Sequence, residues 1–364
     1  MNIGNREILA NGLEISVDWL SWTILEDSYA VEDVLDMIGF SIAEFQKMPR
    51  GASGYMSRYT HVTLPVSVLA DGREGMGIHV EVSGTAMEAL FGRYISGKTD
   101  VTPFGEKAYN SSSFDFTVLN DFMHDIRQYG HVTRIDIAID DRGCNYYSLS
   151  ELSGILSEKR YVSKFRKWRE IVEHDNGSER SVTTGHTIYL GSRESAIMLR
   201  VYDKQMERNK QLAQGGQDLI MYPWVRWELE LKDERAEEVS RILESKESIN
   251  QVAIGVLSNY LRLIDFDNVR TDRCSTSDKW QSFIDGIRSL SLFVAAPPKT
   301  LDDTRRWLER QVATSLAAVM IADYGDTAFL HKIIKSGELR LSKHQFDMIA
   351  DSQNYCDVYN CDHN

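Results

Sequence analysis

Residues 224–232 (WVRWELELK) alternate between apolar and charged side chains from the second residue to the last. Successive side chains of a β-strand point to opposite faces, so this pattern predicts a strand with one apolar face and one charged face. The charged face carries two carboxylates between two cations: Arg226, Glu228, Glu230 and Lys232. A chain with such a strand needs a sheet that buries one side and keeps reactive groups on the other.

Two further runs predict strands of the same kind. Residues 132–141 (VTRIDIAIDD) place isoleucines on one face and Asp136 and Asp140 on the other. Aspartate is disfavoured in the middle of a strand, so Asp136 suggests a function, whereas Asp141 reads more simply as part of a turn. Residues 187–207 form two β-like runs around a Gly-Ser-Arg-Glu turn, which predicts a hairpin. Its second strand carries Arg200, Tyr202 and Lys204 on one face.

Side by side in one sheet, the three polar faces offer chemistry at a phosphodiester. The hydroxyl of Tyr202 can act as a nucleophile, and Arg200 and Lys204 can hold phosphate oxygens. Asp136, Glu228 and Glu230 are hard oxygen ligands of the kind that Mg²⁺ or Mn²⁺ prefers. An ordinary solvated strand face remains an alternative for each run taken alone.

The rest of the chain predicts an α+β fold, with a central antiparallel sheet, flanking helices and a mostly helical C-terminal region. Strands are expected at residues 14–24, 55–68 and 75–82, helices at 28–40, 85–91, 114–129 and 148–159, and a polar loop at 207–216. After residue 233 the pattern is helical, over about 233–264, 277–290, 301–323 and 326–351. We therefore expect a sheet-based catalytic domain, 1–264, and a helical C-terminal region, 265–364.

Charge is unevenly distributed along the 364 residues, whose formal net charge is −13. Residues 161–235 hold 13 basic and 12 acidic side chains and are the least acidic part of the chain. Residues 159–169 have six cations, no acid and three aromatic side chains, a mixture that can bind phosphates and stack on bases, although it also suits a solvated basic strand. The predicted DNA contacts are Lys164, Arg166, Lys167, Arg169 and Arg193.

The sequence shows no apolar run long enough to span a bilayer and no basic-then-apolar leader, so we expect a cytoplasmic protein without a membrane partner. Four cysteines in so long a chain do not make a disulfide framework. Cys356 and Cys361 lie near His363, where a metal knuckle is conceivable, but the spacing fits no standard zinc pattern.

Six short motifs stand in the order found in one protein family. They are residues 17–22 (VDWLSW), 79–84 (HVEVSG), 134–141 (RIDIAIDD), 189–193 (YLGSR), 200–204 (RVYDK) and 226–230 (RWELE). In these motifs the chain resembles the Rep_trans-type replication initiation factors, which include rolling-circle plasmid and phage initiators and relaxases of integrative conjugative elements. The resemblance covers about residues 14–290, and RVYDK and RWELE are its specific motifs.

This resemblance implies that Tyr202 nicks one DNA strand and stays attached to the 5′ phosphate. It also implies a metal-dependent fold similar to the HUH endonucleases, with carboxylates in place of their histidines. None of the 9 histidines forms a His-x-His pair, in agreement with the replacement of the histidines by carboxylates. The implied partners are a double-strand origin or oriT DNA, single-stranded at the nick, and a host helicase and polymerase. A homodimer is conceivable.

The expected function is therefore initiation of rolling-circle replication of a plasmid, phage or mobile element. Tyrosine attack gives a 5′-phosphotyrosyl link and a 3′-OH that primes synthesis. A conjugative relaxase would use the same chemistry. A non-enzymatic DNA-binding or regulatory protein would keep the fold without nicking, and a metal-dependent hydrolase would use water and form no covalent adduct. No glycine-rich stretch is followed by Gly-Lys-Ser/Thr, so strand separation would need a separate helicase.

Overall fold

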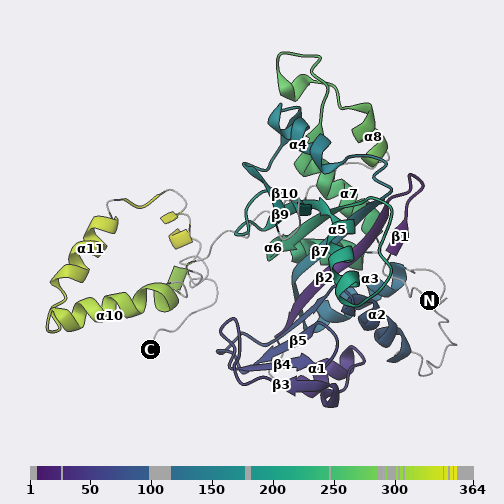
Figure 1. Cartoon of the computed structure of the whole chain (residues 1–364). Helices are drawn as coiled ribbons and strands as arrows, with labels where there is room; N and C mark the ends of the chain where they lie inside the picture. The colour runs from purple at the N-terminus through teal and green to yellow at the C-terminus, as the bar shows by residue number, and fades with distance from the viewer. Residues whose placement is uncertain are drawn as a thin grey trace. The chain divides into compact units, whose positions relative to one another are not determined.

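The computed structural model describes residues 6–25, 28–97, 116–176, 182–245, 247–284 and, with gaps, parts of 290–350. The chain divides into two compact units, Met1–Val294 and Ala295–Asn364. The sheet lies in the first unit (Figure 1). The second contains a π-helical turn, Leu308–Val312, and the helices α10 (Ala313–Ala322) and α11 (Ala328–Glu338). The domain boundary expected after residue 264 stays a prediction.

The described part of the first unit is built on a sheet of eleven strands, in which each neighbouring pair is antiparallel. The strand order is β3-β4-β5-β6-β2-β7-β12-β11-β10-β9, and β1 also pairs with β2. The strands are β1 (Arg6–Ile8), β2 (Glu14–Ile24), β3 (Phe45–Lys47), β4 (Ser57–His61), β5 (Val66–Ala70), β6 (Ile78–Ser83), β7 (Gly130–Arg142), β9 (Trp168–Asp175), β10 (Val182–Leu190), β11 (Ile197–Asp203) and β12 (Trp224–Lys232).

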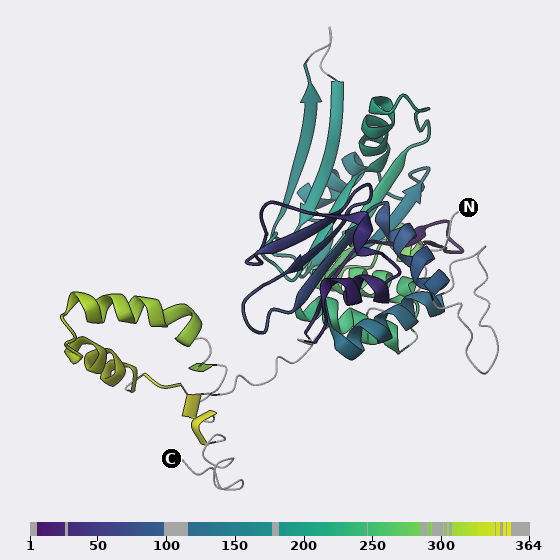
Figure 2. The same ribbon diagram turned by 90° about the horizontal axis from the view of Figure 1, so that it is seen from below.

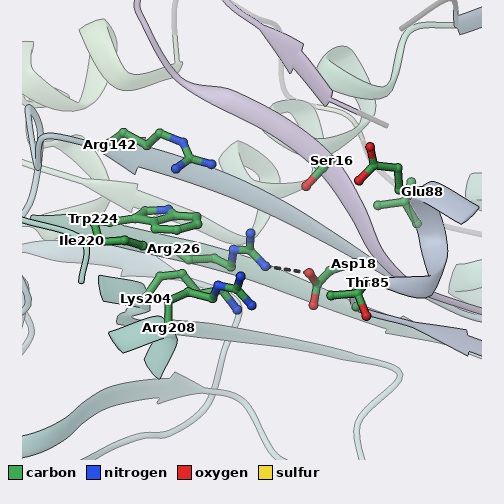
Figure 3. A pocket seen from close by; sticks show the side chains of 12 residues that line it. Ser16, Asp18, Thr85, Glu88, Arg142, Lys204, Arg208, Ile220, Trp224 and Arg226 are labelled. Atoms are coloured by element: carbon green, nitrogen blue, oxygen red, sulfur yellow. Dashed lines mark hydrogen bonds and ion pairs between the residues drawn. The ribbon is translucent and has the colours of Figure 1, made fainter. Parts of the chain in front are cut away.

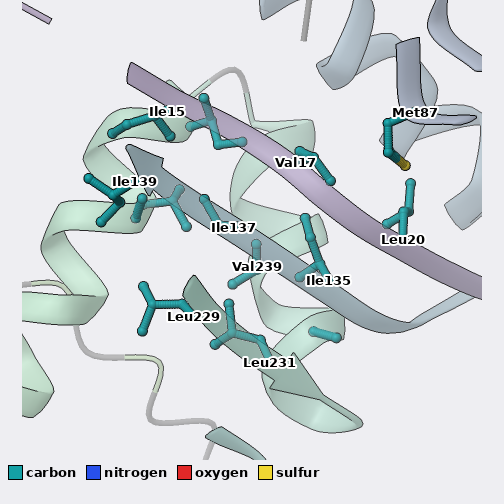
Figure 4. Close-up of a cluster of buried hydrophobic side chains, with 14 of the residues drawn as sticks. Ile15, Val17, Leu20, Met87, Ile135, Ile137, Ile139, Leu229, Leu231 and Val239 are labelled. Atoms are coloured by element: carbon teal, nitrogen blue, oxygen red, sulfur yellow. The ribbon is translucent and has the colours of Figure 1, made fainter. Parts of the chain in front are cut away.

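One face of the sheet is apolar and covered by helices, as the alternation predicts. Ile135, Ile137 and Ile139 of β7 are fully buried beside Leu229 and Leu231 of β12 (Figure 4). The helices that contact β2 or β7 at the centre of the sheet are α2 (Ala86–Gly97), α3 (Phe116–Tyr129), α6 (Glu234–Glu244) and α7 (Ile249–Tyr260). This burial leaves the opposite face to polar and charged side chains.

Smaller elements complete the first unit. They are the helices α1 (Val31–Met37), α4 (Leu149–Ser157) and α8 (Asp278–Ile284), the short 3₁₀ helices Ile42–Glu44 and Thr271–Arg273, and a two-stranded sheet of β8 (Tyr161–Ser163) and β13 (Leu261–Leu263). The teal strands β9 and β10 reach beyond the neighbouring elements (Figure 2). The predicted α+β class, with a large antiparallel sheet, flanking helices and a mostly helical C-terminal part, is confirmed.

Several local expectations were wrong. Residues 261–263, expected within a helix, form the strand β13. Residues 207–216, predicted as a loop, belong largely to the helix α5 (Lys204–Gln214). Asp203 starts this helix, because its carboxylate accepts a hydrogen bond from the backbone N–H of Met206 at 2.8 Å. Lys204 is therefore the first residue of a helix and not part of the strand face. The strand expected at 55–68 is divided into β4 and β5.

No described helix is both long enough and apolar enough to cross a membrane. Cys356, Cys361 and His363 lie outside the described residues.

Candidate active site

The hydroxyl of Tyr202 lies in a small network of charged groups on the polar face. The Tyr202 side chain is 7% exposed, and its hydroxyl donates a hydrogen bond to Oε2 of Glu228 at 2.9 Å. Lys204 Nζ donates to the same hydroxyl at 3.4 Å. Arg200 lies over the Tyr202 ring, 4.7 Å from its centroid, and its Nη2 binds Oε1 of Glu228 at 2.5 Å. The structure thus brings together the tyrosine, both predicted cations and one predicted carboxylate.

The pKa of Tyr202 is raised well above its ordinary value, first by burial and then by the negative charge of Glu228. Near neutral pH the phenol therefore keeps its proton. A protonated phenol is a poor nucleophile and needs a base to take its proton as it reacts. The carboxylate of Glu228 is already within hydrogen-bond distance for that task.

A second network lies beside the first, around Arg226, which is opposite Tyr202 in the strand register. The Nε and Nη2 atoms of Arg226 bind the two carboxylate oxygens of Asp140 at 2.7 and 2.8 Å. Its Nη1 atom binds Asp18 at 2.6 Å, and the indole N–H of Trp224 binds Asp140 at 2.7 Å. The β2–β7 register shifts between Val17 and Trp19, which is a bulge at Asp18.

A third network is centred on Arg134 of β7. Its Nη2 atom lies 2.6 Å from Oδ2 of Asp136 and 2.9 Å from Oε2 of Glu230, while Lys232 binds the other oxygen of Glu230 at 2.5 Å. Asp136 and Glu230 are directly opposite each other in the register, which is why one guanidinium reaches both. Burial raises the pKa of Asp136 to about 7, although Arg134 acts in the opposite direction.

The predicted metal ligands share this face, but each has a cationic or hydroxyl partner. Arg134 lies between Asp136 and Glu230, and both oxygens of Glu228 are engaged by Arg200 and Tyr202. Within the described ranges, no group of three or more His, Cys, Asp or Glu side chains is arranged to hold a metal ion. The ligand role of the three carboxylates stays a prediction.

A cavity of about 380 Å³ opens next to these networks (Figure 3). Lys204 and Arg226, which flank Tyr202, also line the cavity. Four cations and two acids contribute to its lining: Arg142, Lys204, Arg208, Arg226, Asp18 and Glu88. Arg142, Lys204 and Arg226 are also paired with Glu14, Glu207 and Asp140. A lining with more cations than acids, and with Trp224 as an aromatic wall, suits a phosphate-bearing strand.

The predicted DNA contacts are elsewhere on the first unit. Lys164, Arg166 and Lys167 line a second cavity, beside the turn between β10 and β11. Arg169 lies over the ring of Tyr189 at 4.6 Å, and Arg193 is exposed in the β10–β11 turn. None of these five residues is among those that line the cavity beside Tyr202. Their contact with DNA stays a prediction.

Sequence reasoning missed several residues of the site, namely Asp18, Arg142, Arg208 and Trp224, and gave Arg226 no role. Two signals could have found part of this set. Asp18 is an aspartate within a β-branched, aromatic strand, where aspartate is disfavoured. Arg226 is on the same strand face as Glu228.

Comparison with known proteins agrees with this architecture. The family model described as "Replication initiation factor" (Rep_trans) matches residues 130–334. The chain is 33% identical over 208 residues to NicK of Bacillus subtilis (strain 168), named as a DNA relaxase. That match covers 56% of this chain and 57% of NicK, so it spans a little over half of each protein.

A solved structure is also similar, that of a rolling circle replication initiator protein from Geobacillus stearothermophilus. The TM-score is 0.59 at 26% sequence identity, and the match covers 78% of this chain and 99% of the other. The family model alone covers more than half of the sequence and includes β7, β11 and β12, the strands that carry most residues of the three networks. The chain belongs to the Rep_trans family of replication initiation factors.

Proposed function

We propose that this protein nicks one strand of origin DNA through Tyr202 and so starts rolling-circle replication of a plasmid, phage or other mobile element. The observation that carries the proposal is the Tyr202–Glu228 hydrogen bond beside a cation-lined cavity. Family membership supports the same reaction. The substrate is a double-strand origin with a single-stranded segment at the nick.

In this mechanism the Tyr202 oxygen attacks phosphorus while its proton passes to Glu228. A new O–P bond forms to the tyrosine, the bond from phosphorus to the 3′ oxygen breaks, and the 3′ oxygen takes a proton from solvent. In this proposal Arg200 and Lys204, which both contact Tyr202, stabilise the charge that develops on the non-bridging oxygens. One phosphodiester is exchanged for another, so the link can be resealed without ATP.

A conjugative relaxase is the second candidate, favoured by the similarity to NicK. The chemistry at Tyr202 is the same, and the two roles differ in the DNA site, an origin or an oriT. In either role we propose that a host helicase separates the strands and a host polymerase extends the 3′-OH. We also propose residues 1–264 as the nicking domain, and a homodimer as the active form.

The proposal is tested with a supercoiled plasmid that carries the protein's own gene and its flanking DNA, incubated with the protein and Mg²⁺. We expect relaxed circles in which protein stays bound to DNA through denaturation with detergent. Relaxation without a covalent adduct would indicate a hydrolase that uses water. Binding without relaxation would indicate a non-enzymatic replication protein.

We also propose that nicking needs Mg²⁺ or Mn²⁺, as the family resemblance implies. The present geometry does not fit a divalent ion at the three predicted ligands. Arg134 binds Asp136 and Glu230, and Arg200 binds Glu228. EDTA should abolish nicking and added Mn²⁺ should restore it; full nicking in EDTA would contradict the requirement. A ligand role for Asp136 would appear as a higher Mn²⁺ requirement in Asp136→Ala. An unchanged requirement would leave Asp136 as a partner of Arg134 only.

A further inference from the structure

A second cavity, of about 530 Å³, lies at the turn between β10 and β11. Four segments far apart in the sequence form it: the stretch between β8 and β9, the β10–β11 turn, the start of α6 with Arg235, and the end of α7 with Tyr260. The side chains that give it chemical character are Lys164, Phe165, Arg166, Lys167, Arg235 and Tyr260. We refer to it as the turn cavity.

Cations dominate the lining of the turn cavity, although Glu194 of the adjoining β10–β11 turn and Glu238 of α6 act on Lys167 and Arg235 through space. Four of its lining residues are cations, and none of the described residues that line it is acidic. Lys164 donates to the side-chain oxygen of Asn259 at 2.6 Å, but Arg166, Lys167 and Arg235 form no ion pair with any residue that the structure describes. On the polar face, by contrast, Arg134 and Arg226 are each bound by two carboxylates.

Cations that lie close together without a carboxylate in direct contact repel one another, so their grouping favours binding of an anion. Arginine and lysine donors bind phosphate oxygens, and arginine can do so with two hydrogen bonds. Tyr260 and Phe165 add an aromatic wall, with ring centroids 5.3 Å apart.

The turn cavity is separate from the Tyr202 site. Ile197, at the start of β11, lines it, and Tyr202 is five residues farther along the same strand. A strand rises about 3.4 Å per residue, so the two positions are about 17 Å apart along β11. They are also on opposite faces: Ile197 points to the helix-covered side together with Leu199 and Val201, and Tyr202 points to the polar side.

We propose that the turn cavity is a second DNA-contact site, which binds backbone phosphates of the duplex beside the nick. This inference rests on the proposed function, because DNA is the anionic polymer that the protein has to hold. Phosphate contacts supply affinity and position but no base recognition and no chemistry. The turn cavity therefore contributes to holding duplex DNA, while a short single strand at Tyr202 does not reach it.

The test compares Lys167→Ala/Arg235→Ala with the matched control Arg73→Ala/Lys210→Ala, which removes two exposed cations outside the turn cavity. Affinity for a random-sequence duplex is measured by fluorescence anisotropy over a series of salt concentrations. Each lost phosphate contact lowers the slope of log affinity against log salt by about 0.9. The cavity variant should thus lose up to about 1.8 in slope, and the control should match the wild type.

Two further measurements keep the result interpretable. The charge-conserving variant Lys167→Arg/Arg235→Lys should retain the wild-type slope, which separates loss of charge from loss of folding. Nicking of a short single-stranded substrate is measured for every variant, so that loss of the nicking reaction is recognised separately from loss of duplex affinity. An unaltered salt slope in Lys167→Ala/Arg235→Ala would overturn the inference, even if nicking is observed. If the slope falls but neither the wild type nor any variant nicks DNA, the DNA-contact role of the turn cavity is supported and the proposed nicking function is rejected.

Discussion

Tyr202→Phe should bind duplex DNA as the wild type does and show no nicking above the background of the assay. Phenylalanine keeps the ring under Arg200 and removes only the oxygen that attacks phosphorus. The measurement is relaxation of supercoiled plasmid, together with anisotropy for binding. Tyr189→Phe is the matched control, because Tyr189 is opposite Arg200 on the neighbouring strand and also has a guanidinium over its ring. Normal nicking by Tyr202→Phe, or loss of nicking in Tyr189→Phe, would assign the nucleophile to a residue other than Tyr202.

The same substitution should cost only modest stability. It leaves Oε2 of Glu228 without the hydroxyl of Tyr202, and a buried group that loses its partner costs about 1–3 kcal/mol. Thermal unfolding of Tyr202→Phe should therefore remain cooperative, with a lower midpoint. A variant that failed to fold would make its loss of nicking uninformative, so the unfolding measurement accompanies the relaxation assay.

Glu228→Gln should lower the nicking rate by about 10²–10⁴-fold, the usual contribution of a general base. Glutamine keeps the size and can still accept a hydrogen bond, but it takes up no proton from the phenol. Because the pKa of Tyr202 is raised, the phenol is almost entirely protonated near neutral pH and depends on a base. The residual rate of Glu228→Gln should then rise with pH, as hydroxide replaces the missing base.

Glu230→Gln is the control for that experiment. Glu230 is two residues along the same strand face, but its partners are Arg134 and Lys232 and not the tyrosine. Its rate should stay within about tenfold of the wild type, less than the smallest effect expected of a general base. Equal losses in both variants would mean that the two carboxylates act by fixing the charge networks, and Glu228 would lose its assignment as base.

The strands were predictable wherever alternation is unbroken. The predicted bounds 224–232 agree with β12, whose alternation is complete after Trp224. The bounds 14–24 agree with β2 because that run is β-branched and aromatic, although the bulge at Asp18 interrupts its alternation. Helix α5 was missed because it has no apolar stripe. Its start depends on the Asp203 cap, and its Gln205 and Asn209 side chains bind the backbone of Ile220. Such contacts leave no periodic signal in the sequence.

Many residues of the polar face were predictable, but the pairing of its acids with its cations was not. The alternation of β7, β11 and β12 places the acids and cations on one side. Which charges meet depends on the register between strands, and only the structure shows that Arg134 reaches both Asp136 and Glu230. Asp18 enters from a bulge in β2, and a bulge in one strand cannot be found without its partner.

The central claim is that the Tyr202 oxygen becomes linked to the 5′ phosphate of the cut strand. Mapping the covalent adduct tests it most directly: the protein is incubated with nicking substrate, digested with protease and nuclease, and the nucleotide-bearing peptide is sequenced by mass spectrometry. The account predicts a nucleotide on Tyr202 within the segment RVYDK. An adduct on another tyrosine, such as Tyr189 or the exposed Tyr222, would contradict it.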